Sequence, residues 1–427
     1  MKPYQISTEL HNFFRTFEDD LTKPQMNRMK EIMHGIICGR QGTLSEIARQ
    51  NRCKQKKSVR KQVEQYSNML LKFPLETMII RKLIGLRGKV ENDTPLYFDL
   101  VDITKKYHRS METIGNTWDG SEGKPGKGYE MVDVSLGVEH GGMSLYRHMY
   151  STENLDYGSQ VKEIEKVLEV LIAAWGEMRG TAFVDAGGDN DRLVSLFLEY
   201  QASFVIRMNV NRGVKDRIVL NERGDRVKMM ELWEGVVQGM TMWRDAKKKK
   251  QKMVQLMWRK IWWEHEGALL PMWMVWSHRE GDKDPCVFLT SRLIENESDA
   301  EKVYTQYFER GGKEEAIFKC NKTKLGMEKV QLCSMEKVRQ LMLIYILVDQ
   351  FLAKLHEQAM TAGHLLHTFL MAFVRGNQRK ITKWAIIDFY DDTFAKLEWD
   401  MLTFRRRFWP TPPHSQLSLF LNPNQKW

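Results

Sequence analysis

The chain has 427 residues, too many for one ordinary domain and enough for two or three domains with their own cores. Apolar residues make up 42% of the sequence and charged residues 28%, a balance that excludes a mostly disordered protein. The formal net charge is +10, and phosphate polymers are the commonest partners of basic proteins.

Neither hydropathy nor cysteine usage suggests a membrane or secreted protein. The longest apolar run, Leu341–Val348, is far shorter than the roughly 20 residues that span a bilayer. The first residues lack the apolar stretch of a signal peptide. The five cysteines include no C-x-x-C pair, so we expect reduced thiols, no zinc site and a cytoplasmic protein.

Residues 1–88 are polar and patterned for helices, and we predict a helical DNA-binding domain there. The segment Thr43–Arg49 is typical of the first helix of a helix-turn-helix, with its first residue as N-cap and Glu46 placed to close a capping box. Arg60 and Lys61 lie on the next expected helix, where we predict that they contact DNA. The alternative is a solvated basic helix in a small bundle.

From residue 89 to 212 short apolar runs alternate with amphipathic stretches, as in an α/β protein. The pattern predicts three strands, a helix, a strand, a helix and a strand, at residues 95–101, 129–138, 144–150, 160–178, 182–185, 189–200 and 204–208. Such an order builds a mixed sheet with helices packed against it. We predict this segment to be the first part of a core that residues 291–330 complete.

Residues 213–290 interrupt that core with strand-like, tryptophan-rich segments, which predict a β-rich insertion domain. Trp258 is a candidate to stack on an unpaired base, although tryptophans of a small domain more often build its own core. The rest of the chain is patterned for helices. We predict a helical C-terminal region at residues 331–409 and a loose tail at 410–427.

Asp99 and Asp185 each stand where an apolar strand runs into a loop. Parallel strands end at the same edge of a sheet, so we expect the two carboxylates side by side. Buried carboxylates are costly unless they are paired or bind a cation, and their oxygens suit Mg²⁺ or Mn²⁺. The alternative for either residue alone is a strand-end or N-cap aspartate. Asp102 is a rival to Asp99 that lies further beyond the apolar run.

A late helix supplies a candidate third acid. Helical spacing after Tyr307 puts four side chains on one face, those of Glu315, Phe318, Lys319 and Lys322. A carboxylate flanked by cations in this way is suited to ligate a metal ion while the lysines hold phosphates. A solvated face of i,i+4 ion pairs is the alternative interpretation.

With these residues in this order, the chain resembles DDE transposases of bacterial insertion sequences, of the insertion-sequence-four group. That group carries its third acid in a Y-x2-R-x3-E-x6-K signature. Here the matching places are taken by Tyr307, Arg310 and Lys322, with one extra residue between Arg310 and Glu315. Glu314 is therefore an alternative third acid.

The segments Asp99–Lys105 and Phe183–Asp189 are similar to that group's first and second aspartate blocks, and the likeness runs over residues 90–330. The resemblance implies an RNase H-like core and two Mg²⁺ or Mn²⁺ ions held by Asp99, Asp185 and Glu315. It also implies that Tyr307, Arg310 and Lys322 contact the transposon end. We add Lys105 and Lys319, basic residues of the same segments, as candidate DNA contacts.

The activity implied by the resemblance is strand cleavage at transposon ends and strand transfer into target DNA. The implied partner is double-stranded DNA, bound by a homodimer on paired ends, in the cytoplasm and on the nucleoid. Two alternatives stay open. One is an RNase H-like nuclease or resolvase that cuts without joining, and the other is a domesticated or decayed transposase that only binds DNA.

Overall fold

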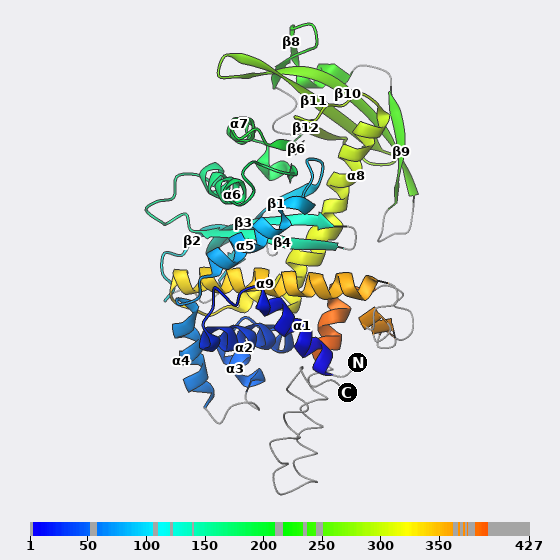
Figure 1. The fold of residues 1–427 in the computed structure, drawn as a ribbon. Coiled ribbons are helices and arrows are strands. Elements are labelled where there is room, and N and C mark those ends of the chain that lie inside the picture. The colour runs from blue at the N-terminus through cyan, green and yellow to red at the C-terminus, as the bar shows by residue number, and fades with distance from the viewer. Residues whose placement is uncertain are drawn as a thin grey trace, which may run out of the picture.

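The chain is arranged as a helical layer, a central sheet and a β-rich end (Figure 1). The structure is a computed structural model. It describes residues 3–51, 58–105, 110–119, 123–138, 141–209, 217–233, 237–244, 251–361, 366–367, 370–371, 374 and 381–391. The predicted tail at 410–427 lies outside these residues. Among the helices of the described ranges, none combines the length and the apolar character needed to cross a membrane.

The helical layer holds the helices predicted for residues 1–88. They are α1 (Pro3–Arg15), α2 (Lys23–Gly39), α3 (Leu44–Gln50), α4 (Val59–Leu70) and α5 (Leu75–Leu86). Thr43 caps α3 as predicted, because its side chain accepts the N–H of Glu46. The Glu46 carboxylate pairs with Arg49 at 2.9 Å.

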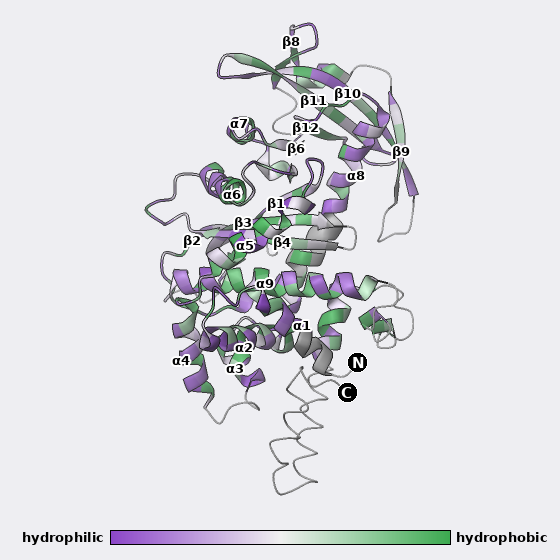
Figure 2. Cartoon of the chain, viewed as in Figure 1, coloured by the Kyte–Doolittle hydropathy of each residue, from purple (hydrophilic) through white to green (hydrophobic). Residues whose placement is uncertain are grey.

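A long helix, α9 (Met335–Met360), runs through the middle of this layer. Every residue from Leu341 to Leu352 is buried, because α9 contacts α2, α4 and α5 as well as strand β4 (Gly141–Tyr150). Figure 2 shows hydrophilic residues along the outer helix α4 and hydrophobic ones along the central strands. The helices therefore bury α9 and share one core with the sheet.

The central sheet contains the predicted series of strands and helices in the predicted order. Its elements are β1 (Pro95–Thr104), β3 (Lys124–Val138), β4, α6 (Gln160–Trp175), β5 (Thr181–Val184), α7 (Asp191–Glu199) and β6 (Ser203–Met208). A short strand β2 (Gly115–Asp119), which the pattern does not predict, pairs with β3. Strands β1, β5 and β6 are parallel, while β3 runs antiparallel to both β1 and β4.

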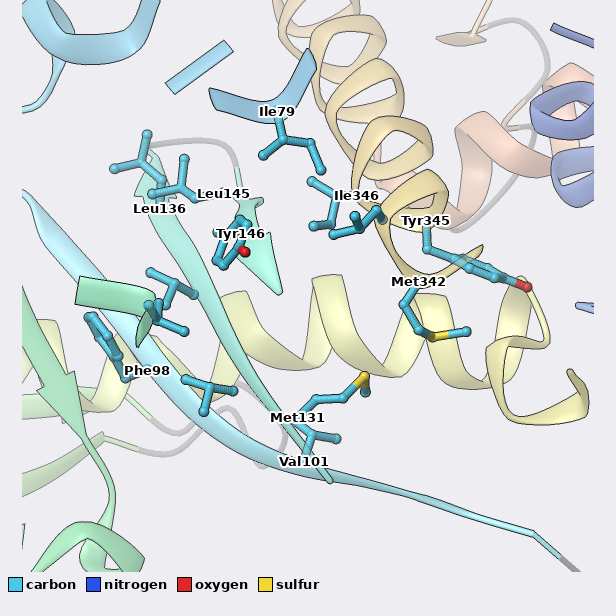
Figure 3. Close-up of a cluster of buried hydrophobic side chains, with 14 of the residues drawn as sticks. Ile79, Phe98, Val101, Met131, Leu136, Leu145, Tyr146, Met342, Tyr345 and Ile346 are labelled. Atoms are coloured by element: carbon cyan, nitrogen blue, oxygen red, sulfur yellow. The ribbon is translucent and has the colours of Figure 1, made fainter. Parts of the chain in front are cut away.

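One face of this sheet meets the helical layer through a continuous apolar core. Figure 3 shows members of this core from four elements, among them Ile79 of α5, Leu145 of β4, Leu136 of β3 and Ile346 of α9. These side chains are buried. Removing such groups from water supplies the main driving force for packing helices on the sheet.

The predicted β-rich insertion is present as strands, and it continues the central sheet. The strands are β7 (Ile218–Leu220), β8 (Arg226–Lys228), β9 (Gly239–Arg244), β10 (Gln251–His265), β11 (Ala268–Arg279) and β12 (Cys286–Thr290). Strand β12 pairs antiparallel with both β6 and β11, so a single mixed sheet of 12 strands, mostly antiparallel, spans the molecule. The insertion is thus joined to the core by backbone hydrogen bonds.

Helix α8 (Glu297–Glu314) crosses the face of this sheet from the β-rich end toward the helical layer (Figure 1). It continues without a break as a π-helix, η6 (Glu315–Lys324). Beneath α8, Tyr97, Phe183 and Val205 from the three parallel strands form a second buried cluster with Tyr304 and Tyr307 of the helix. This packing fixes α8 over the carboxyl end of β5 and the neighbouring part of β1.

Candidate active site

Asp99 and Asp185 lie side by side on neighbouring parallel strands, Asp185 directly after the end of β5 and Asp99 in the middle of β1, which continues to Thr104. The β1–β5 register pairs Phe98 with Val184, so the two aspartates occupy the next position on each strand. Asp185 also caps the short 3-10 helix η3 (Ala186–Gly188), and its carboxylate accepts the N–H of Ala186 at 2.6 Å. The two aspartates are therefore neighbours as predicted, and Asp185 is also an N-cap, but the strand-end prediction is wrong for Asp99, because pairing with β3 extends β1 beyond it.

These aspartates belong to a row of charged side chains that runs across five strands. We call it the charged row; in order from β4 through β3, β1 and β5 to β6, it consists of Arg147, Asp133, Asp99, Asp185 and Arg207. Residues in register on adjacent strands project from the same face. Tyr97 and Phe183, two positions earlier, pack under α8, so the charged row faces that helix too.

Sequence reasoning did not single out Asp133 or Arg147. The signal available for Asp133 is one acid within the apolar run from Met131 to Val134, where β3 is buried. Its partner is only evident from the register of β3 on β4, which pairs Asp133 with Arg147.

Asp185 is held by two side chains of α8, both of which the signature predicts as functional. The Tyr307 hydroxyl donates to Oδ1 at 2.8 Å, and the Arg310 guanidinium lies 3.0 Å from Oδ2. Arg310 also covers the Tyr307 ring at 5.3 Å, and Arg207 approaches Oδ1 at 4.0 Å. Two residues more than 120 positions from Asp185 thus converge on it.

The electrostatics of Asp185 follow from these contacts. Burial raises its pKa, but Arg310, the Tyr307 hydroxyl and the Ala186 N–H together outweigh burial, and the pKa of Asp185 lies below its usual value. Burial also raises the pKa of Tyr307, so its hydroxyl remains a donor. Asp185 is therefore ionised and still half-exposed, at 48% of its side chain.

The pKa of Asp99 is shifted in the opposite direction. Its pKa is raised from 3.8 to about 6, chiefly by burial; Arg310 opposes the shift, and Asp133 and Asp185 contribute to it. Burial likewise raises the pKa of Asp133. Like charges gathered in a partly buried site disfavour ionisation, and a cation relieves that repulsion. The cluster is electrostatically suited to take up positive charge.

The third acid is carried by the segment where α8 becomes η6. Tyr307, Arg310 and Glu314 stand at i, i+3 and i+7, one helical face, and Glu315 is the first π-helical residue. The extra residue before Glu315 lies within the α-helical part, since the π-helix begins only at Glu315. The side chains of Glu314, Glu315 and Lys319 lie outside the described residues, so the choice of acid stays a prediction.

The remaining lysines of the predicted site make internal contacts. The Lys322 ammonium lies 2.7 Å from Glu328 and 3.9 Å from Asp102, the rival to Asp99. Lys105 is buried and donates to the backbone carbonyls of Glu328 and Val330, at 2.8 and 3.0 Å. Burial lowers the pKa of Lys105 to about 8. Lys105 therefore anchors the turn after η6 in this conformation.

Three predicted DNA contacts lie away from the aspartates. Arg60 and Lys61 are exposed on α4, in the helical layer. Trp258 lies on β10, at the other end of the molecule, where it is half-buried against the second cluster (Figure 1). Its placement fits the alternative in which the tryptophan packs on its own domain's core.

The donor set fits Mg²⁺ or Mn²⁺. Both ions prefer oxygen ligands, and Asp99 and Asp185 supply carboxylates from adjacent strands, with the carboxylate of Asp133 on the next strand beside Asp99. Within the described part of the chain, Asp133 Oδ1 is buried and no hydrogen-bond donor reaches it. Arg310 now neutralises part of the negative charge that such an ion would meet.

Comparison with known proteins gives a distant likeness to solved structures and no match by sequence. No protein-family description matches the chain, and no curated protein matches it. Among solved structures, the chain is similar to one in the cryo-EM structure of the piggyBac transposase synaptic complex with hairpin DNA, at 11% identity and a TM-score of 0.36. The match covers 78% of this chain and 58% of that one, so the chain spans less than two thirds of that transposase.

Proposed function

We propose that the protein is a DDE-type DNA transposase that cleaves strands at transposon ends and transfers them into target DNA. The observation that carries this proposal is the contact of Tyr307 and Arg310 with Asp185. The signature picks out the first two from sequence spacing alone, and the strand-end argument picks out the third independently. Their convergence in space supports a common site.

We further propose that β4-β3-β1-β5-β6, with α6 and α7, is an RNase H-like core. The order of elements along the chain and the mixed pairing of the strands support it. The β-rich residues 218–290 lie between β6 and α8, so they interrupt the core just before the helix with the third acid. This is the organisation that the sequence resemblance implies.

In this proposal, Asp99, Asp185 and Glu315, or Glu314 in its place, hold two Mg²⁺ or Mn²⁺ ions. When bound, two such ions activate a water or a 3′-hydroxyl and stabilise the leaving oxygen of an in-line phosphodiester displacement. Arg310 and Tyr307, which hold Asp185 here, would then donate to DNA phosphates, and Lys319 and Lys322 in the following turns are further candidate phosphate contacts.

DNA binding is proposed to extend beyond this site. Arg60 and Lys61 on α4 are exposed cations that suit phosphate contacts, and the net charge of +10 favours a polyanion. Following the resemblance, we propose a homodimer acting on paired ends, in the cytoplasm and on the nucleoid. Lys105 is a weaker candidate for a DNA contact than its position in the sequence suggests, because its ammonium donates to two backbone carbonyls.

The test is a cleavage and joining assay with the full chain, Mg²⁺ and DNA carrying the ends of its own element. The wild-type protein is expected to nick the ends and to join pre-cut ends to target DNA. Asp185→Asn is expected to lose both activities. The matched control is Asp191→Asn, an exposed carboxylate of α7 that pairs with Arg217.

Each other outcome contradicts a part of the proposal. Full cleavage by Asp185→Asn would refute the assignment of that residue. Cleavage without any joined product would make the protein a nuclease instead of a transposase. Binding to the ends with no cleavage in either Mg²⁺ or Mn²⁺ would leave a DNA-binding protein derived from a transposase.

A further inference from the structure

Asp133 is an acid in the middle of a buried strand, directly beside the candidate site. The β1–β3 register places it opposite Asp99, and only 4% of the residue is exposed. Directly opposed residues of an antiparallel pair lie about 5 Å apart and share a face of the sheet. The two carboxylates are therefore close neighbours on the face that α8 covers.

Arg147 holds Asp133 from the other side. Its guanidinium lies 2.8 Å from Oδ2, and the Arg147 side chain is completely buried. It also donates to the sulfur of Met327 at 3.2 Å, in the turn η7 (Met327–Lys329) that follows η6. The pair thus connects the middle of the sheet to the segment that leaves the third-acid helix.

This arrangement costs stability. Two charges are removed from water, and a well-packed apolar pair of similar volume is often neutral or better in such a position. Only Oδ2 of Asp133 meets Arg147; among the described residues no donor reaches Oδ1. An unsatisfied buried acceptor adds a further energetic penalty. If the pair served stability alone, both oxygens of Asp133 would be expected to have donors.

We propose that Asp133, clamped by Arg147, is a positioning residue of the candidate metal site. It acts through Asp99: its fixed negative charge beside Asp99 strengthens the attraction for a divalent cation, and Arg147 keeps that charge in place. The inference rests on the proposed function, since it requires that Asp99 and Asp185 bind a metal ion. Outer partners of metal ligands orient and tune them in this way.

The experiment measures Mn²⁺ binding by the full-length chain, with no DNA, using isothermal titration calorimetry and the electron paramagnetic resonance of free Mn²⁺. Asp133→Asn keeps the shape and removes the charge. Its affinity for Mn²⁺ is expected to fall roughly 10- to 100-fold, the usual cost of losing such a partner. Thermal unfolding is measured alongside.

Asp349→Asn is the matched control. It breaks the ion pair of Asp349 with Lys383, which is the other fully buried pair of an aspartate and a cation among the described residues. It is expected to lower the melting temperature to a similar degree and to leave Mn²⁺ affinity unchanged. If Asp133→Asn does not fold, Arg147→Lys replaces it. That variant keeps the charge but not the fork geometry, and it too is expected to weaken Mn²⁺ binding.

The outcomes separate this proposal from the one on which it rests. A wild-type Mn²⁺ site that is lost in Asp185→Asn but unchanged in Asp133→Asn overturns the positioning role alone. An equal loss of affinity in Asp133→Asn and Asp349→Asn also overturns it, because the effect is then one of stability. A wild-type chain with no Mn²⁺ site that depends on Asp185 overturns both.

Discussion

Two regions of the molecule contain buried aspartates, and they differ in how the carboxylate charge is compensated. Beside α9, Asp349 has both oxygens satisfied, by the Lys383 ammonium at 2.9 Å and the backbone N–H of Ser144 at 2.8 Å. Beneath α8, three carboxylates gather in the charged row, and burial lifts the pKa of Asp99 to about 6. A carboxylate that serves only the fold is neutralised locally. The site under α8 instead retains negative charge, which suits a cation from outside.

The largest loss of stability is expected when the Asp349–Lys383 pair beside α9 is broken. Lys383→Met leaves the Asp349 charge buried without its cation, and breaking such a pair costs about 3–5 kcal/mol of unfolding free energy. The control is Lys302→Met, whose partner Asp93 is 49% exposed, and a surface pair contributes about 1 kcal/mol at most. Denaturant titration of both variants measures the difference; equal losses would mean that the Asp349–Lys383 pair behaves as a surface pair.

Asp99→Asn tests the other side of the contrast, where activity and stability are expected to move in opposite directions. Loss of a ligand carboxylate is expected to reduce cleavage by more than about 100-fold, beyond the cost of losing an outer partner. Stability should rise by about 1–3 kcal/mol in the absence of metal, because the variant removes a charge whose pKa is raised from 3.8 to about 6. A less stable variant would contradict the repulsion inferred for the charged row.

The same carboxyl predicts a pH dependence. The folded pKa of Asp99 lies above its unfolded value, so ionisation of Asp99 destabilises the fold, fully above pH 6 and not at all below pH 3.8. The stability advantage of Asp99→Asn is therefore expected to shrink as pH falls from 6 toward 3.8. Thermal melts in EDTA across this range measure it, and an advantage independent of pH would assign the stabilisation to something other than charge.

The sequence predicts the parts of the site that depend on local pattern. Alternating strands and helices predict parallel neighbours, and the β1–β5 register places Asp99 beside Asp185, although β1 continues past Asp99 to Thr104. The fixed spacing of Tyr307 and Arg310 puts both on one face of α8, and the helix lies over these strands. That spacing needs no knowledge of which distant strands pair.

The rest depends on long-range register. The pairing of Asp133 with Arg147, and the continuation of the sheet from β6 to β12, join segments whose relative alignment no local period specifies. The burial of Lys105 is similarly hidden, because a lysine at the end of a strand is normally solvated. The π-helical geometry from Glu315 onward is also not predicted by the sequence pattern, which indicates an ordinary α-helix there.

The smallest predicted effect is that of Tyr307→Phe, and it separates the two roles of this side chain. The ring packs on Phe288 with centroids 4.8 Å apart, and that contact survives the change. Only the hydroxyl is lost, so the expected cost is about 0.5–1.5 kcal/mol, the net value of one hydrogen bond. Asp185 keeps Arg310 and the Ala186 N–H, which limits the loss. Tyr304→Phe, one turn earlier on α8, is the control. Denaturant titration measures the stability of both variants, and binding to transposon ends measures their DNA affinity. A loss of DNA affinity in Tyr307→Phe but not in Tyr304→Phe would mean that the Tyr307 hydroxyl moves from Asp185 to the DNA. Equal affinities would mean that the hydroxyl only stabilises the site in the absence of DNA.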